Sequence, residues 1–192
     1  MLKIANYTLS GIPYTDPPAS TGDGKMSLIL ASQGFAPGER VGRTISVVSL
    51  DVQWSVEHTT VASSAEDQNT IRVIFVEDRA PLGYHVRDYP AAFDITPGNA
   101  QLSHVKVDVQ PPLFTVLADE LHVVRTQNAT KSRVSGRKHF DFPDPLVCIF
   151  GDDPFINFPN NRQLAVLFVL QKFDPLGSDV FNINVQMTYF DH

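Results

Sequence analysis

The sequence predicts an all-β protein, folded as a single eight-stranded antiparallel domain of the jelly-roll type. No segment sustains the i, i+3, i+4, i+7 apolar pattern of an amphipathic helix over three turns, and Pro90 interrupts the best candidate, His85–Ile95. Five segments instead carry the features of strands, rich in β-branched and aromatic residues. The connections between them are long and rich in Pro and Gly, as is typical of antiparallel sandwiches and barrels.

The strand segments follow one another along the chain with turn-forming residues between them. In "TISVVSLDVQWSVEH" the apolar series from Val48 to Val56 alternates with polar residues, which indicates a strand with one dry face. In Leu113–Arg125 the apolar parity changes, and a bulge near Asp119-Glu120 would explain the change. The five clear segments are Thr44–His58, Asn69–Glu77, Leu113–Arg125, Asn161–Phe173 and Ser178–Asp191; weaker ones are Lys25–Ser32, Gln101–Val109, Lys131–Phe142 and Leu146–Phe150.

Length and composition fit one ordinary globular domain. The chain has 192 residues, of which 43% are hydrophobic and 19% charged, enough for a sizeable core. Fifteen Lys and Arg stand against 21 Asp and Glu, a net charge of −6, which argues against whole-surface attraction to nucleic acid or anionic membrane. No window approaches the roughly 18 apolar residues that span a bilayer, so we expect no membrane insertion. The N-terminal "MLKIANYTLSG" also lacks a signal-peptide core.

Motifs of catalysis are missing from the sequence. There is no phosphate-binding glycine loop, no H-E-x-x-H and no G-x-S-x-G, and the six histidines are scattered without metal-ligand spacing. The single Cys148 lies in an apolar run, which indicates a small core residue rather than a nucleophile. We therefore predict that the protein is not an enzyme and needs no cofactor.

Carboxylate pairs and basic residues are the remaining candidates for chemistry. Asp152 and Asp153 form a turn in "GDDP", and a structural calcium ion is the alternative to simple solvation there. Asp78 and Arg79 mark the end of a buried strand, where an ion pair within or between subunits is expected. Basic residues gather once, in "KSRVSGRKHF", and this cluster reads either as a solvated strand edge or as a phosphate-binding patch.

Four short motifs, taken in their order along the chain, resemble those of a known group of proteins. An R-x-G-x-x-I start at Arg40, Gly42 and Ile45 leads into the first long strand, and the next strand ends in Asp78-Arg79 before Gly83. A later strand opens with "FTVLAD", and the chain finishes with Tyr189 and Asp191. In this order the motifs resemble the coat proteins of small circular Rep-encoding single-stranded DNA viruses, the circovirus-like group, and they are also similar to coats of satellite necrosis-type plant viruses.

The resemblance implies a jelly-roll capsid domain over residues 34–192, preceded by a partly extended N-terminal segment, residues 1–33. It implies a structural protein whose copies, about sixty in the simplest shell, close into an icosahedral particle around single-stranded DNA. The protein would reside in the virion, and in the host nucleus or cytoplasm during assembly, and would meet a host receptor of unknown identity. Loops and the charged strand end would supply the contacts between copies, with these candidate residues: Tyr84, Tyr89, Phe93, Phe155, Phe158, Asp78 and Arg79.

One departure from that family concerns nucleic acid. Such coats normally begin with an arginine-rich arm, whereas this chain has only Lys3 and Lys25 in its first thirty residues. Binding of DNA would then fall to an arm outside this sequence or to basic residues on an inner surface: Arg40, Arg43, Arg125, Lys131, Arg133, Arg137 and Lys138. Counterion release from so few charges predicts weak and salt-sensitive binding.

Two alternatives remain open at this point. One is a non-viral jelly-roll binding module, lectin-like or trimeric, that holds a glycan or a receptor with its loop carboxylates. The other is a sandwich-fold hydrolase, for which the sequence offers no nucleophile–base pair.

Overall fold

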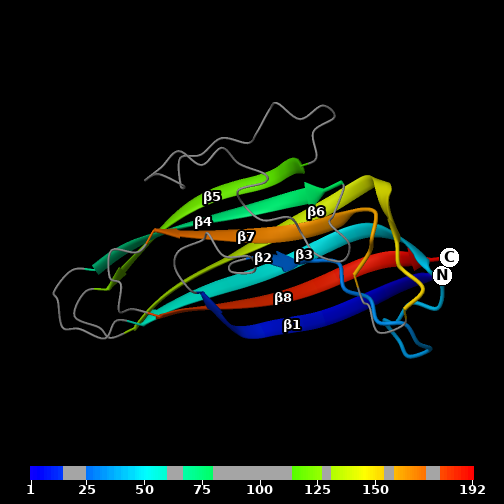
Figure 1. Cartoon of the computed structure of the whole chain (residues 1–192), viewed down its shortest axis with the longest axis horizontal. Helices are drawn as coiled ribbons and strands as arrows, with labels where there is room; N and C mark the ends of the chain where they lie inside the picture. Colours follow the sequence, from blue (N-terminus) through cyan, green and yellow to red (C-terminus); the bar gives the residue numbers. More distant parts are fainter. Residues whose placement is uncertain (15–24, 60–66, 80–113, 127–130, 154–157, 172–177) are drawn as a thin grey trace.

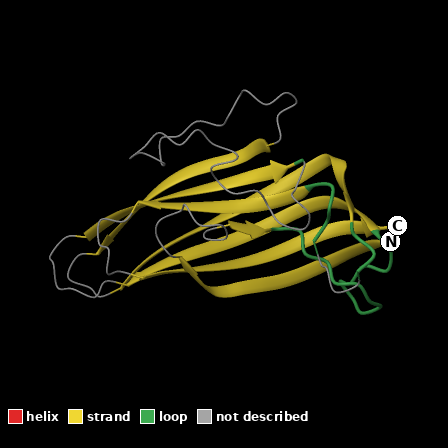
Figure 2. Cartoon of the chain, in the orientation of Figure 1, coloured by secondary structure: helices red, strands yellow, loops and turns green. Residues whose placement is uncertain are grey.

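The computed structural model describes residues 1–14, 25–59, 67–79, 114–126, 131–153, 158–171 and 178–192. These residues form strands and connecting loops without a helix, so that none of them could cross a membrane as a helix (Figures 1 and 2). In chain order the strands are β1 (Leu2–Tyr14), β2 (Lys25–Ser27), β3 (Thr44–Thr59), β4 (Asp67–Asp78), β5 (Phe114–Thr126), β6 (Lys131–Ile149), β7 (Gln163–Gln171) and β8 (Ser178–Asp191).

The strands build two antiparallel sheets of four strands each, in the orders β1-β8-β3-β6 and β2-β7-β4-β5. Only β4 and β5 are neighbours both in the sequence and in a sheet; every other pairing joins strands that are distant along the chain. This order is the jelly roll, in which two Greek keys fold into facing sheets. The predicted fold class is confirmed.

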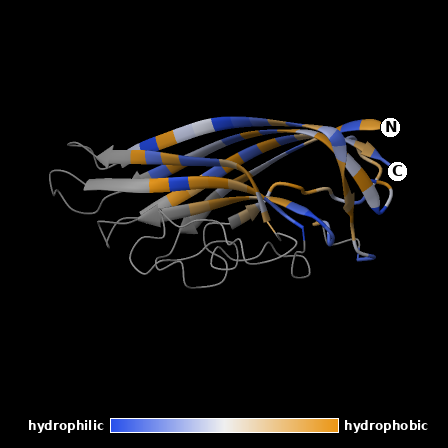
Figure 3. Ribbon diagram, turned by 90° about the horizontal axis from the view of Figure 1, so that it is seen from above, coloured by the Kyte–Doolittle hydropathy of each residue, from blue (hydrophilic) through white to orange (hydrophobic). Residues whose placement is uncertain are grey.

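The core lies between the sheets and follows from the period-two patterning. Apolar and polar residues alternate along the strands, as the bands in Figure 3 show, so each strand turns one side inward. Trp54 of β3 lies at the centre, with its ring 6.3 Å from Phe168 and 4.8 Å from His122. The rings of Phe168 and Phe181, from opposite sheets, are 4.3 Å apart. Aromatic pairs across the interior thus hold the two sheets together.

Two bulges shift the predicted phase of the strands. In β3 the register against both neighbours skips from Val47 to Ser49, so Val48 is the extra residue rather than a member of the inward series. In β5 the skip falls at Leu117, between the residues opposite Phe75 and Val76. The expected bulge therefore exists but lies shortly before Asp119-Glu120. In β3 the added residue lets Val47 before it and Leu50 after it both face the core, whereas in β5 Leu121 and Val123, beyond the bulge, are 57% and 48% exposed.

The N-terminal segment belongs to the fold. β1 pairs with β8 along its length, and the short β2 pairs with β7, so the expected boundary at residue 34 does not separate two units within the described residues. The two weak strands Lys131–Phe142 and Leu146–Phe150 fall within one strand, β6, whose pairing with β3 is interrupted between Asp141 and Leu146, where Pro143 and Pro145 lie. Proline is tolerated at such an interruption because no ladder hydrogen bond is needed there. Gln101–Val109 lies outside the described residues.

Asp191 ties the two ends of the chain together. Its carboxylate accepts hydrogen bonds from Lys3 Nζ at 2.7 Å, from the Val41 amide at 2.8 Å and from the Gly42 amide at 3.3 Å. Burial alone would raise the pKa of this carboxyl, but the three donors outweigh burial and hold its pKa below the usual value. The first and last strands are therefore joined by a charged network as well as by their ladder.

This network predicts an acid-sensitive contribution to stability. Because the folded pKa of Asp191 is lowered, its ionised form stabilises the fold above the unfolded pKa of about 3.9, and this stabilisation is lost as pH falls through the folded pKa. We expect Asp191→Asn to reduce the free energy of unfolding by about 1 kcal/mol at neutral pH and by less in acid. Urea unfolding across this pH range measures the difference. Asp152→Asn, in an exposed pair, is the control and should stay near zero; a deficit for Asp191→Asn that is equal at every pH contradicts the prediction.

Candidate functional site

The outward faces of the two sheets differ in character. On β2-β7-β4-β5 the outward residues Ile74, Val76 and Leu167 are buried although they alternate with core residues. On β1-β8-β3-β6 the outward residues over the middle of the sheet are polar, whereas toward the chain termini the outward side carries exposed apolar residues: Leu2, Ile4, Val147, Ile149 and Phe190. We call the polar middle of this sheet the polar face; it comprises Asn6, Thr8, Asp51, Gln53, Ser55, Arg133, Ser135, Arg137, Asn182, Asn184 and Gln186.

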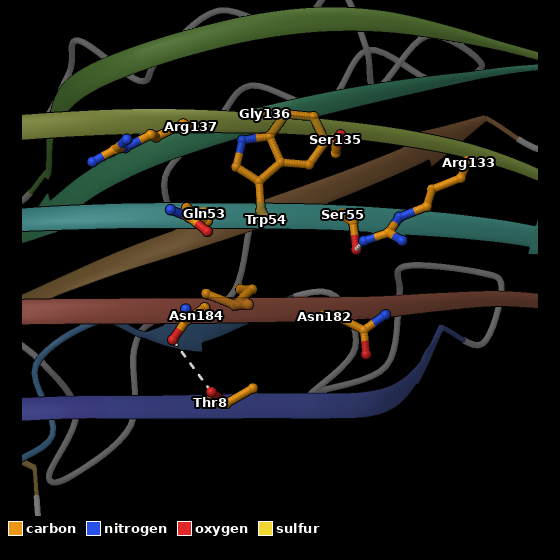
Figure 4. A pocket seen from close by; sticks show the side chains of 11 residues that line it. Thr8, Gln53, Trp54, Ser55, Arg133, Ser135, Gly136, Arg137, Asn182 and Asn184 are labelled. Atoms are coloured by element: carbon orange, nitrogen blue, oxygen red, sulfur yellow. Dashed lines mark hydrogen bonds between the residues drawn. The ribbon is translucent and has the colours of Figure 1, made fainter.

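A hollow of about 540 Å³ lies in the polar face and crosses all four strands (Figure 4). Hydrogen bonds between neighbouring strands order its side chains. Thr8 lies 3.2 Å from the amide oxygen of Asn184, to which its hydroxyl donates, and Arg133 donates to the Ser55 hydroxyl at 3.1 Å. Amides, hydroxyls and the guanidinium groups of Arg133 and Arg137 together can bind phosphate oxygens, sugar hydroxyls or base edges.

The charges on the polar face largely cancel. Arg137 makes a bidentate pair with Asp51, with N–O distances of 2.8 and 2.5 Å. The hydrogen bond from Arg137 is the main cause that lowers the pKa of Asp51, and the same bond raises the pKa of Arg137. Arg133 instead donates to a neutral hydroxyl, and it lies opposite Glu57 in the register of β3 and β6. The face is thus a hydrogen-bonding surface with little net charge.

Arg40 does not lie on a nucleic-acid surface. Its side chain is fully buried and donates from Nε to the Ala31 carbonyl at 3.0 Å and from Nη1 to the Gly42 carbonyl at 2.8 Å. The guanidinium carbon lies 4.2 Å above the centre of the Phe150 ring. Arg40 is therefore a packing residue, and the expectation of DNA contact is corrected at this position.

The other predicted basic residues do not converge on one patch. Arg43, just before β3, pairs with Asp152 at 2.6 Å, at the opposite end of β3 from Arg133. Lys138 has the other parity from Arg137 on β6 and pairs with Glu120 of β5 at 2.5 Å. The backbones of Arg125 and Lys131 lie in β5 and β6, opposite Gln68 and Thr59. Within the described side chains, Arg133 and Arg137 are the pair from the predicted set that share the polar face.

Of the aromatic residues predicted to make contacts between copies, the structure describes one. Tyr84, Tyr89, Phe93 and Phe155 lie outside the described residues. Phe158 is half-buried and borders a groove beside β1.

At the charged end of β4, the ion pair involves a different carboxylate from the one that the sequence predicts. β4 ends at Asp78 as expected, but Asp78 is fully buried and does not offer a surface for another copy. Arg79 lies 3.4 Å from Glu77, whose other oxygen accepts from Arg162 Nε at 2.7 Å. The ion pair at this strand end thus involves Glu77.

The described residues place no further side-chain ligands for a calcium ion beside Asp152 and Asp153. Asp152 is exposed and paired with Arg43, and in the described ranges no three His, Cys, Asp or Glu side chains gather as a metal site. Calcium binding by Asp152 and Asp153 stays a prediction.

Cys148 is a buried core residue, and its chemistry should follow from that position. Burial raises the pKa of its thiol to about 12, so almost no thiolate forms near neutral pH. We expect the native protein to react with a thiol reagent only as fast as it opens, and at the rate of a free thiol in denaturant. Reaction at the free-thiol rate under native conditions would contradict this burial.

Sequence reasoning missed the polar face although a signal for it was present. Asn182, Asn184 and Gln186 occupy alternate positions of β8, so three amides must lie on one side of one strand. Their neighbours across the sheet come from β1 and β3, and this adjacency depends on the topology.

Comparisons with known proteins give distant structural likeness only. No family model and no curated protein sequence matches the chain. Among solved structures, a virus-like particle of the giant freshwater prawn nodavirus has 11% identity and a TM-score of 0.41, over 100% of this chain and 85% of that one. Mud crab tombus-like virus has 13% identity and a TM-score of 0.40 (98% and 80% covered), and turnip yellow mosaic virus 12% and 0.35 (98% and 92%). These values are too low to assign the chain to a family.

Proposed function

We propose that this chain is a viral coat protein, with a structural and not a catalytic role, whose copies assemble into a small icosahedral shell around single-stranded DNA. The observation that carries the proposal is the strand order, β1-β8-β3-β6 facing β2-β7-β4-β5, which is the jelly roll implied by the coat-protein motifs. The motif residues have structural roles that agree with this reading. Arg40 and Gly42 anchor the entry to β3, and Tyr189 donates to the Gly38 carbonyl at 3.1 Å beside Asp191.

The polar face is the surface that we assign to the genome. Its amides and hydroxyls can hydrogen-bond a flexible strand, while Arg133, with Arg137, supplies the positive charge. Because Arg137 is already paired with Asp51, about one phosphate is neutralised per copy, and the logarithm of the binding constant should fall with that of salt at a slope near −0.7 for a single strand. Binding by one copy is then weak, and a closed shell gains retention from the many copies that act together.

Electron microscopy of the purified protein at low and high salt tests the proposal. Uniform shells support it, and nuclease treatment of their contents separates single-stranded DNA from RNA. Arg133→Gln should reduce the nucleic acid retained per particle, whereas Arg43→Gln, paired at the far end of β3, should not. Monomers or small oligomers at every salt and protein concentration contradict the shell.

The hollow in the polar face favours one second candidate, a glycan-binding module. Paired amides, hydroxyls and an Arg–Asp pair are the groups that bind sugar hydroxyls. This function predicts a small oligomer that binds glycans and loses that binding when Asn184 is replaced by Leu. A shell-forming protein without glycan binding excludes it.

A further inference from the structure

We propose that two copies of this chain join by a reciprocal exchange, in which Phe35 of each copy inserts into a groove beside β1 of the other. The proposal deepens the shell function by naming one contact between copies, and it rests on self-association of the chain. Its evidence comes from the exposure of Phe35, from the turn that carries it, and from the groove that lies beside that turn.

Phe35 is the most exposed large apolar side chain of the described residues, at 93%. It lies in the loop between β2 and β3, at the end of the sandwich where the described loops and both chain ends gather (Figure 2). Its phenyl group takes no part in the core, although aromatic side chains are among the residues that gain most from burial. That gain is therefore left for a contact with another molecule.

The turn that carries Phe35 is held by hydrogen bonds on both sides of it. The Gly34 amide donates to the Arg40 carbonyl at 3.0 Å, and the Glu39 amide donates to the Ala36 carbonyl at 3.0 Å. The Glu39 carboxylate in turn accepts from the Ala36 amide at 2.9 Å. Because the turn is ordered before any contact is made, little conformational entropy is lost when the phenyl group binds. This condition is the one that favours an anchor residue.

The base of the turn is fastened to the first and last strands. Lys3 donates to the Glu39 carbonyl at 2.6 Å, and Tyr189 donates to the Gly38 carbonyl at 3.1 Å. Gly38 packs so closely on β1 that an added methyl group would lie 2.8 Å from the Ile4 carbonyl oxygen. The turn thus covers this part of the β1 edge, so that a contact between copies here is made by side chains and not by an added strand.

A groove of about 660 Å³ beside this turn can accept a phenyl ring. One wall is Ile4–Tyr7 of β1, and the other is the loop that carries Phe35. Most of its lining side chains are apolar or aromatic: Ile4, Ala5, Tyr7, Leu30, Pro37 and Phe158. Phe35 does not fill the groove of its own chain, since its side chain is almost fully exposed. Phe158, predicted from the sequence as a contact residue, would pack on the ring of the other copy.

A second copy is the partner that this arrangement fits. Pro37 and Gly38 line the groove only two and three residues after Phe35, so the projecting ring and the groove share one surface. A two-fold axis beside that surface lets each copy fill the groove of the other, which closes the contact.

The apolar surface at this end is large enough for such a contact. Half of the exposed large apolar side chains of the described residues lie on this loop or at the start of β1: Met1, Leu2, Ile4, Phe35 and Val41. Together they expose on the order of 600 Å², which is much of the roughly 800 Å² that each partner buries in a standard interface.

Phe35→Ser tests the anchor. We expect the dimer dissociation constant to rise at least about tenfold, whereas urea unfolding should stay as in the wild type because the side chain is exposed. Leu121→Ser, at a 57% exposed position on β5, is the matched control and should change neither. Sedimentation of protein freed of nucleic acid gives the dimer constant, and an apolar contact predicts that salt weakens it little.

A blocked groove supplies a second readout. Ser32 is exposed and lines the groove, so Ser32→Trp should fill it and weaken the dimer as Phe35→Ser does. An equal mixture of the two variants should associate more tightly than either variant alone. The reason is that Phe35 of the Ser32→Trp chain still finds an open groove on the Phe35→Ser chain.

Three results overturn the exchange: a wild type that is monomeric at every concentration, a Phe35→Ser variant with an unchanged dimer constant, or a mixture that gains no affinity. Shells that form from the Phe35→Ser variant retain the proposed function and exclude this contact. Dimers that depend on Phe35 but never form a shell retain the contact and contradict the proposed function.

Discussion

Arg40→Ala is expected to lower the free energy of unfolding by about 3 kcal/mol, among the larger effects of any single change in this chain. The guanidinium is fully buried, satisfies the carbonyls of Ala31 and Gly42, and covers the Phe150 ring. Burial lowers the pKa of Arg40, and the nearby Asp191 partly offsets that effect. The negative charge of Asp191 thus helps to keep the buried guanidinium protonated. Alanine leaves acceptors without a donor and a void over the aromatic ring. Urea denaturation with an unchanged m-value measures the loss.

Arg43→Ala is the matched control for this prediction. Arg43 lies three residues further on but is exposed, and its pair with Asp152 is exposed as well. Exposed pairs contribute at most about 1 kcal/mol, so this variant should unfold nearly as the wild type does. Arg40→Lys retains the charge but not the planar fork that reaches two carbonyls, and its stability should fall between the other two. Equal stabilities of the Arg40→Ala and Arg43→Ala variants would refute a packing role for Arg40.

Gly136→Ala is expected to lower the free energy of unfolding by about 2 kcal/mol through a clash in the centre of the core. Gly136 is directly opposite Trp54 in the register of β3 and β6. A methyl group on Gly136 would lie 2.6 Å from Cζ2, 2.7 Å from Cε2 and 2.9 Å from Nε1 of the indole. Since the indole is held by Phe168 and His122, it cannot move aside without loss of those contacts. Thermal or urea unfolding detects the change.

The indole can be identified as the cause by a double-mutant cycle. Trp54→Phe destabilises the protein by itself, but its smaller ring removes the atoms closest to the new methyl group. Gly136→Ala should therefore cost less in the Trp54→Phe background than in the wild type. Ser135→Ala, one residue away and on the exposed side, should have little effect in either background. If Gly136→Ala costs the same in both backgrounds, the backbone rather than the indole is responsible.

Strands were predictable where one side of the strand is apolar and the other polar. β3 and β8 satisfy this condition because one face meets the core and the other is the polar face. The sequence pattern did not predict β1 as a full strand, because some of its apolar residues face outward and a charged residue faces inward. Leu2 and Ile4 face outward, whereas Lys3 turns toward Glu39 and Asp191. Because a charged residue occupies an inward position and apolar residues occupy outward positions, the sequence of β1 shows no regular alternation of apolar and polar residues.

The basic residues show why a cluster in the sequence is not a surface patch. Arg137 and Lys138 are adjacent in β6, so strand geometry alone sends them to opposite sides, and this separation could have been foreseen. The burial of Arg40 could not, since it depends on the packing of a loop against Phe150, more than one hundred positions away. Local patterns therefore predict which side of a strand a residue occupies, and long-range topology decides what lies there.

The position of β8 between β1 and β3 affects how the chain acquires its structure during synthesis. Residues 178–191 are made long after residues 2–14, yet β8 is the one strand of the described residues that pairs with β1. While the ribosome translates the intervening residues, the N-terminal strand must wait without its neighbour, exposed to chaperones and to other nascent chains. The sheet can close only late, and the large sequence separation of its contacts makes this a slow step. A ribosome stalled before residue 178 therefore holds a chain whose first strand has contacts with residues 28–39 but lacks its ladder partner.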